Sequence, residues 1–251
     1  MKQIDKKYNE ENLFKKSWNN FIENLKIFFE KKLNIFSFSL VVFLIFIAIF
    51  APILAPYQYD LVNPSNALAP PSLEHFMGTD TTGRDIFSRV LHGTTTSLSL
   101  ALTTIIFGLL TGVSIGAVSG YFAGIVDEII MRIVDVFMSI PGVILALAMV
   151  SILGPSPVYL VLALSIRRII QFARVTRGVV LSIKELDYIS ACHAIGVSNT
   201  KIIFAHVLPN CIGPIIVLST VLIGNVILME STLSFLGMGI QEPTPSWGTM
   251  I

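Results

Sequence analysis

The sequence predicts an all-α fold, a polytopic transmembrane helical bundle with five spans. Of the 251 residues, 53% are hydrophobic and only 13% are charged, whereas a soluble domain usually has about a quarter of its residues charged. The charges also occur in blocks, separated by uncharged runs long enough to cross a lipid bilayer, which takes roughly 20 apolar residues. The low charged fraction predicts a lipid environment. The charges form blocks and no basic patch, so we expect no nucleic-acid partner.

The uncharged runs define the spans. One run, 136–166, is too long for a single span and contains the helix-breaking sequence Gly154-Pro155-Ser156-Pro157, so we expect two spans to share it. We expect the five spans at 35–54, at 97–119, from about 129 onward, from the break at 154–157 to beyond Arg167, and at 211–235.

Lysine and arginine bias sets the orientation, because these residues accumulate in cytoplasmic segments. The tail before residue 33 has eight lysines and the 174–209 segment has four basic residues, whereas the 55–96 loop has more acidic residues than basic ones. We therefore expect a multi-pass protein of the cell membrane with a cytoplasmic N-terminus and an external 55–96 loop. The domains would be the tail 1–34, the first helix with its loop 35–96, and a core 97–251.

The tail has an apolar stripe with spacings of three and four residues, which predicts an amphipathic helix. It would lie on the inner membrane surface or pack on a partner subunit, and the sequence leaves both open. The stripe consists of Phe14, Trp18, Phe21, Ile22, Leu25 and Phe28.

Glycines recur at every fourth position in and after the second span. This spacing places them on one face of a helix, so that another helix can approach closely. The set is Gly108, Gly112, Gly116, Gly120 and Gly124.

Four charged residues lie within or beside apolar runs: Asp135, Arg167, Arg168 and Glu230. Such residues usually face a protein interior or water. Asp135 is three residues from Arg132 and could pair with it on a helix. Glu230 is a candidate for an interhelical hydrogen bond or for the lining of a path, and the two arginines could either extend to the inner surface or line a cavity.

The external loop contains a polar turn between Gly78 and Gly83, followed by a short amphipathic stretch from Ile86 to Leu91. We expect a short helix there, lying at the outer interface. The histidines and aspartates of this region match no known spacing of metal ligands, so we expect no metal site.

The segment 184–209 predicts two short helices joined by a tight turn. Gly196 supplies the left-handed conformation that ends a helix, Ser198 or Asn199 can cap the next helix, and Pro209 is expected to interrupt the chain before the fifth span. Such an element suits insertion into a groove on a partner protein.

This segment resembles the coupling loop of ABC importer permeases, whose pattern is Glu-Ala-Ala, three residues, Gly, nine residues and Ile-x-Leu-Pro. Gly196, Leu208 and Pro209 match it, His206 takes the isoleucine position, and only the alanine matches in Ser190-Ala191-Cys192. The resemblance implies that these residues contact an ATPase.

Three further stretches resemble the C-type subunits of the dipeptide, oligopeptide and nickel permease family: 78–85, 120–132 and 230–248. The resemblance implies a second related permease subunit, two ATP-binding-cassette ATPase subunits and an extracytoplasmic solute-binding protein as partners. Family members have six spans, so this chain would lack the last one. It also has Ile169-Ile170-Gln171-Phe172-Ala173-Arg174 where the family has Trp-Pro-x-Tyr-Ala-Arg.

The sequence has no Gly-Lys pair and therefore no Walker A loop. We expect a transport subunit that is not itself an enzyme and has no cofactor, with ATP and Mg²⁺ bound by the partner ATPases. The alternative is an ion-coupled secondary transporter, which would be expected to show inverted repeats and broken helices. A membrane-embedded enzyme is disfavoured because neither His-Glu-x-x-His nor Gly-x-Ser-x-Gly occurs.

Overall fold

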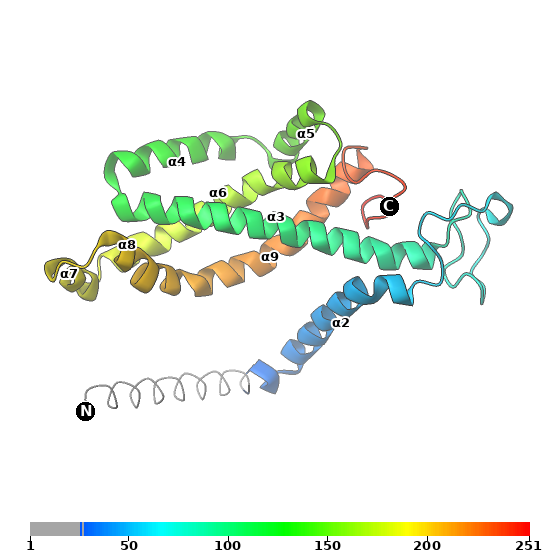
Figure 1. Cartoon of the computed structure of the whole chain (residues 1–251), viewed down its shortest axis with the longest axis horizontal. Coiled ribbons are helices and arrows are strands. Elements are labelled where there is room, and N and C mark those ends of the chain that lie inside the picture. Colours follow the sequence, from blue (N-terminus) through cyan, green and yellow to red (C-terminus); the bar gives the residue numbers. More distant parts are fainter. Residues whose placement is uncertain (1–25, 27) are drawn as a thin grey trace. The chain divides into compact units, whose positions relative to one another are not determined.

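A computed structural model describes residues 26 and 28–251 (Figure 1). Helices dominate this part of the chain, which contains no strand apart from an isolated bridge between Thr79 and Asp85. The prediction of an all-α polytopic membrane protein is confirmed. The elements are α2 (Lys32–Leu54), the 3-10 turn η1 (Pro64–Asn66), α3 (Ile86–Phe122), α4 (Gly124–Ser139), α5 (Gly142–Leu153), α6 (Pro157–Lys184), α7 (Asp187–Ala194), α8 (Asn199–Ile202), the π-helical η2 (Ile203–Val207) and α9 (Leu208–Phe235).

The structure consists of two units, which divide after Phe50. The first unit includes most of α2, an apolar helix long enough to cross a membrane. The amphipathic stripe predicted for the tail lies outside the described residues, except for Phe28. The second unit, from Ala51 onward, contains the bundle.

Three helices in the described residues are long and apolar enough to span a membrane by themselves: α2, α3 and the continuous helix Asn199–Phe235. The bent pair α4 and α5 makes a fourth span if it is counted as one. Helix α6 is less apolar because of its arginines, but its 28 residues give a length of about 42 Å. The break predicted at 154–157 is where α5 ends and α6 begins.

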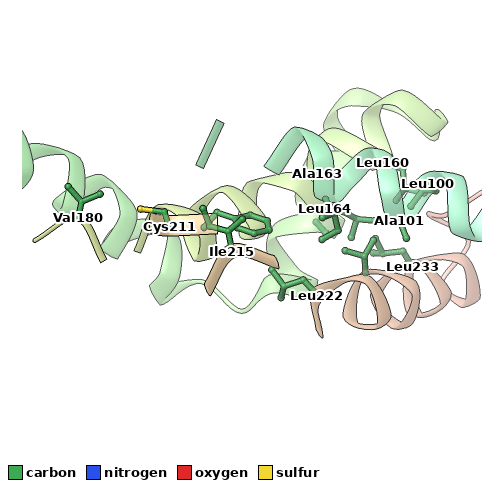
Figure 2. Close-up of a cluster of buried hydrophobic side chains, with 14 of the residues drawn as sticks. Leu100, Ala101, Leu160, Ala163, Leu164, Val180, Cys211, Ile215, Leu222 and Leu233 are labelled. Carbon is green, nitrogen blue, oxygen red and sulfur yellow. The ribbon is translucent and has the colours of Figure 1, made fainter. Parts of the chain in front are cut away.

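Helices α3, α6 and α9 form the centre of the second unit, and Figure 1 shows them side by side. Figure 2 shows Leu100 and Ala101 of α3 close to Leu160 and Leu164 of α6, with Leu233 of α9 opposite them. All five side chains belong to one buried apolar cluster that continues along α6 and α9. Packing within a membrane depends on such close side-chain contact, because lipid is as apolar as the side chains themselves.

Four of the predicted glycines lie where α3 and α6 run in the same direction in contact. A Cβ on Gly108 would lie 2.6 Å from Cβ of Arg168, and one on Gly120 would lie 2.9 Å from Cβ of Val180. Gly112 and Gly116 face the backbone of the intervening turns of α6. A groove of glycines therefore brings the two helices closer than any side chain would allow.

The fifth glycine of the series is not part of this groove, so the prediction was wrong for Gly124. Helix α3 ends at Phe122, and Gly124 begins α4 with a φ of +56° and no neighbour within 4 Å of a built Cβ. Gly124 therefore serves the turn between the two helices, where a positive φ favours glycine.

The short outer helix expected at 86–91 is instead the first part of α3, which continues unbroken to Phe122. The Asp85 carboxylate caps the helix by accepting a hydrogen bond from the Ser88 amide at 2.7 Å. Gly93 lies within this helix, and a Cβ built on it would lie 3.5 Å from the Ser246 backbone of the C-terminal segment.

The third span was predicted as one helix from about residue 129, and this is wrong. Helix α4 starts earlier, at Gly124, and the axis bends by 91° between α4 and α5. The cause is Pro141, which has no amide hydrogen to donate and forces Ile140 into an extended conformation with ψ of 127°.

Pro209 was expected to interrupt the chain before the fifth span, but the helix continues through it. The π-helical segment η2 precedes Pro209, and α8, η2 and α9 together form one helix from Asn199 to Phe235. A π-helical turn changes the hydrogen-bond register by one residue, which accommodates the missing amide hydrogen and the ring of the proline.

Candidate functional site

A helical hairpin, defined here as residues 187–207, lies at the end of the bundle where α3 and α6 both end. It consists of α7, a tight turn, α8 and η2 (Figure 1). The loop at 55–85 lies at the opposite end of α3, before its first residue. The hairpin and the loop are therefore separated by the full length of α3, about 55 Å.

The turn of the hairpin is a Schellman motif. Gly196 has a φ of +78°, its amide donates to the His193 carbonyl at 3.0 Å, and the Val197 amide donates to the Cys192 carbonyl at 3.0 Å. This pair of hydrogen bonds satisfies the last carbonyls of α7 and reverses the chain in few residues. Ser198 occupies the cap position of α8, but its side chain makes no capping hydrogen bond.

The hairpin has both buried and exposed apolar side chains. Ile189, Ile202 and Val207 are buried in the same cluster as the bundle core, which fixes the hairpin to α6 and α9. By contrast Tyr188, Ile195 and Phe204 are exposed, Ile195 to 79% and Phe204 to 67%. Tyr188 and Ile195, on α7 and its turn, lie outside the candidate spans, so their exposed apolar side chains are available for contact with a partner protein.

The residues predicted for an ATPase contact fall on this hairpin and on the first turn of α9. Ser190, Ala191 and Cys192 lie on α7, His206 lies in η2, and Leu208 and Pro209 start α9. Ser190, Ala191, Gly196 and Pro209 are exposed. Cys192 is partly buried against the core cluster and so contributes to the attachment of α7.

Tyr121, which the sequence reasoning did not select, connects α3 to the hairpin. Its hydroxyl lies 3.0 Å from Oδ1 of Asn199 and 3.3 Å from Nε2 of His193, and its side chain is buried. The Nζ of Lys184 donates to the Tyr121 carbonyl at 2.6 Å. Tyr121 lies in the 120–132 stretch that resembles the permease family, but this resemblance does not identify its contacts with residues more than 60 positions away.

Helix α4 is attached to α6 by two ion pairs on this half of the bundle. Asp127 accepts two hydrogen bonds from the Arg177 guanidinium, each at 2.5 Å, and also one from Ser119. The predicted pair between Asp135 and Arg132 is wrong, because Asp135 pairs with Arg174. An interhelical partner replaces the local one because the α6 arginines lie directly beside α4.

Arg168 is buried in the bundle and does not extend to the surface. Its guanidinium donates to Oε1 of Gln171 at 2.8 Å and to Oδ1 of Asn225 at 3.1 Å, and thereby joins α6 to α9. Its Nε has no partner in the described part of the chain. Arg167 is half-buried and lies 3.4 Å from the Ile140 carbonyl, at the break between α4 and α5.

Glu230 is buried near the end of α9, where it holds the C-terminal segment. Its Oε1 accepts hydrogen bonds from the hydroxyls of Ser234 at 2.6 Å and Ser246 at 2.8 Å. Trp247 then contacts α3, because its amide donates to the Ser97 hydroxyl and its indole donates to the Thr94 hydroxyl. Glu230 thus joins α9 to the non-helical C-terminal segment, at the end of the bundle remote from the hairpin.

The 55–85 loop is joined to the C-terminal segment by charged side chains. Arg84 and Arg89 both pair with Glu242, Arg89 at 3.0 Å, and Arg84 also pairs with Asp80 at 2.6 Å. Burial alone would raise the pKa of Asp80, but hydrogen bonds from Thr82 and Arg84 lower it to about 2. His75 pairs with Asp85 at 2.9 Å, and no group of three metal-ligating side chains occurs in the residues the structure describes.

The comparisons with known proteins agree with this arrangement. Residues 112–251 match the family described as binding-protein-dependent transport system inner membrane component. The chain belongs to this family. Residues 18–71 match the N-terminal transmembrane domain of oligopeptide transport permease C, so the two matches together cover the first span and most of the bundle.

Several relatives match most of the chain. The dipeptide transport system permease protein DppC of Alkalihalophilus pseudofirmus is 41% identical over 93% of this chain and 76% of its own length. The glutathione transport system permease protein GsiD of Pectobacterium atrosepticum is 41% identical over 84% and 70%. The oligopeptide transport system permease protein OppC of Bacillus subtilis is 35% identical over 96% and 79%.

Family membership decides against the ion-coupled secondary transporter. The break between α4 and α5 is a feature that such carriers also have. A discontinuous helix is a local consequence of Pro141, however, whereas the family match extends over 140 residues of the bundle and hairpin. The chain is therefore a multi-pass permease component of a binding-protein-dependent transport system.

Proposed function

We propose that this chain is the C-type transmembrane subunit of an ATP-binding-cassette importer for peptides. It would form part of the translocation path together with a second, related permease. The proposal rests on family membership and on the names of the relatives, which transport dipeptides, oligopeptides or glutathione. Each of these solutes is a small peptide or a peptide derivative, which favours peptides over nickel as the solute.

Separate ATPase subunits would supply the energy by binding the hairpin. The observation that carries this step is the exposed apolar surface of Tyr188, Ile195 and Phe204 on an element that is itself fixed to the bundle. The sequence has no Walker A loop, so ATP and Mg²⁺ would bind to the partner chains. Movement of the ATPases would displace the hairpin, and the hairpin would displace α6 and α9, to which it is directly connected.

The hairpin and the N-terminal tail would be cytoplasmic, and the 55–85 loop and the 238–250 segment would be external. Two observations support this orientation. The hairpin and the loop lie at opposite ends of α3, and basic residues are concentrated in the tail and the 174–209 segment. A solute-binding protein would then meet the external surface formed by the loop and the C-terminal segment.

Replacing Ile195 tests the contact with the ATPases. Removing an apolar side chain that becomes buried in a complex costs about 1.5–3 kcal/mol, so Ile195→Ser is expected to weaken ATPase binding about tenfold or more. Ile125→Ser is the matched control, because Ile125 is exposed to 76%, close to the 79% of Ile195, and lies just beyond the same end of α3.

The measurement is the amount of ATPase that co-purifies with each tagged variant from native membranes after dilution. Equal ATPase recovery with the parent chain and with Ile195→Ser would contradict the proposal. So would accessibility of the hairpin to a membrane-impermeant thiol reagent in intact cells, after Ala194→Cys substitution.

A further inference from the structure

The hairpin is connected to α6 and α9 by the chain itself, but its connection to α3 depends on side chains. Helix α7 follows α6 after two residues, and η2 continues directly into α9. Helix α3 precedes the hairpin by more than 60 residues and is not covalently adjacent to it. A displacement of the hairpin therefore reaches α3 at this end through non-covalent contacts.

The Tyr121 hydroxyl supplies such a contact to both helices of the hairpin. It lies 3.3 Å from Nε2 of His193 on α7 and donates to Oδ1 of Asn199 on α8 at 3.0 Å. A phenol has one hydrogen, and Tyr121 gives it to Asn199. The tyrosine oxygen is then left to accept from Nε2 of His193, in the tautomer that carries its hydrogen on Nε2. The network therefore runs in one direction, from α7 through α3 to α8.

Lys184 fixes the other side of the same residue. Its Nζ donates to the Tyr121 carbonyl at 2.6 Å and lies 5.7 Å from the centre of the Tyr121 ring. A cation in this position also compensates the partial negative charge at the end of α3. The tyrosine is therefore held by the end of α6 and by both hairpin helices, and its ring is buried in the apolar cluster.

We infer that Tyr121 is a positioning residue that passes displacement of the hairpin to α3. This inference rests on the proposed function, because it assumes that ATPases move the hairpin. Helix α3 contacts α6 along the glycine groove, so movement of α6 already reaches α3 by one path, and the Tyr121 hydroxyl adds a direct path from the hairpin. Without the hydroxyl, the hairpin would still bind the ATPases, but its movement would reach α6 and α9 more effectively than α3.

Tyr121→Phe removes the hydroxyl and keeps the buried ring. The assay uses the whole transporter with its second permease, its ATPases and its binding protein in proteoliposomes, and measures peptide transported per ATP hydrolysed. We expect Tyr121→Phe to lower this ratio at least about 2- to 10-fold, the effect of losing one of the two hydrogen bonds of the hydroxyl, with unchanged recovery of ATPase. Tyr159→Phe, at the start of α6 and remote from the hairpin, is the control.

Asn199→Ala removes the same hydrogen bond from the hairpin side, where a surface substitution leaves the core intact. Because the His193 contact remains, we expect Asn199→Ala to lower the ratio by no more than Tyr121→Phe does, and the double variant to be no worse than Tyr121→Phe alone. An unchanged ratio in both single variants, or multiplicative effects in the double variant, would overturn the inference. Failure of the parent chain to recover ATPase would instead refute the proposed function.

Discussion

Substitution of Gly112 by alanine tests whether the glycine groove sets the distance between α3 and α6. The new methyl carbon would lie 2.5 Å from the Ile169 carbonyl oxygen and 2.7 Å from Cβ of Phe172. Contacts of this kind are normally about 3.5 Å or longer. Because the first obstacle is backbone, a rotamer change cannot relieve the contact, and the two helices must separate by about 1 Å.

The net effect follows from two opposing terms. Overpacking of a helix interface costs about 1–3 kcal/mol, and a backbone obstacle favours the upper part of that range. Alanine in place of glycine within a helix returns about 1 kcal/mol. We therefore expect Gly112→Ala to lower the free energy of unfolding by about 1–2 kcal/mol, which lowers Tm by about 2–8 °C for a chain of this size.

Gly224→Ala is the matched control. Gly224 lies in the interior of α9, is exposed, and has no neighbour within 4 Å of a built Cβ. Only the helix-propensity term applies there, so Tm is expected to rise by about 2–4 °C. Thermal unfolding of both variants in one detergent, followed by far-ultraviolet circular dichroism, decides the matter. A Gly112→Ala variant as stable as Gly224→Ala would refute the close packing of the two helices.

Two further predictions concern charged residues. Arg168→Lys is expected to lower the free energy of unfolding by about 1.5–3 kcal/mol, because one ammonium cannot reach both amide oxygens that accept from the guanidinium. Arg167→Lys is the control and should have little effect. Equal unfolding temperatures for the two variants would contradict the prediction. The lowered pKa of Asp80 stabilises the 55–85 loop above its unfolded pKa of 3.8, and this stabilisation is lost as pH falls toward about 2. At pH 4, pepsin should therefore cleave the parent loop more slowly than the loop of an Asp80→Asn variant. Near pH 2 the two loops should be cleaved at the same rate. Equal cleavage at pH 4 would contradict the lowered pKa of Asp80.

The sequence was sufficient to predict the helical class and most of the span positions. Long uncharged runs have one plausible structure in a bilayer, because a helix satisfies every backbone polar group within the segment. The same reasoning located the break before α6 at Gly154 and Pro155, since this break depends on neighbouring residues alone.

Local reasoning was wrong where the structure depends on one residue within a favourable pattern. Pro141 breaks the third span although the sequence around it is apolar, whereas Pro209 leaves its helix continuous because a π-helical turn precedes it. Pro141 and Pro209 both follow an apolar residue in a predicted helix, so the sequence alone does not distinguish them. The difference lies in the hydrogen-bond register of the surrounding backbone, which no residue pattern specifies.

The candidate site was predictable only in part, for a related reason. Gly196 was identified from its place after a short helix, and the structure gives it the positive φ that glycine allows. Tyr121 and the pairing of Asp135 with Arg174 could not be predicted, because each contact joins residues at least 39 positions apart. Such pairs depend on which helices become neighbours, and a single sequence does not contain that information.

The absence of an interruption between α8 and α9 has a mechanical consequence. A single helix extends from Asn199, beside the Tyr121 hydroxyl, to Phe235, one turn beyond the carboxylate that anchors Ser246. A rigid rotation of this helix about its long axis at the hairpin would turn Glu230 by the same angle, some 45 Å away. The hydrogen bond between Glu230 and Ser246 would therefore weaken when the hairpin rotates, and no other element would have to transmit the movement across the bilayer.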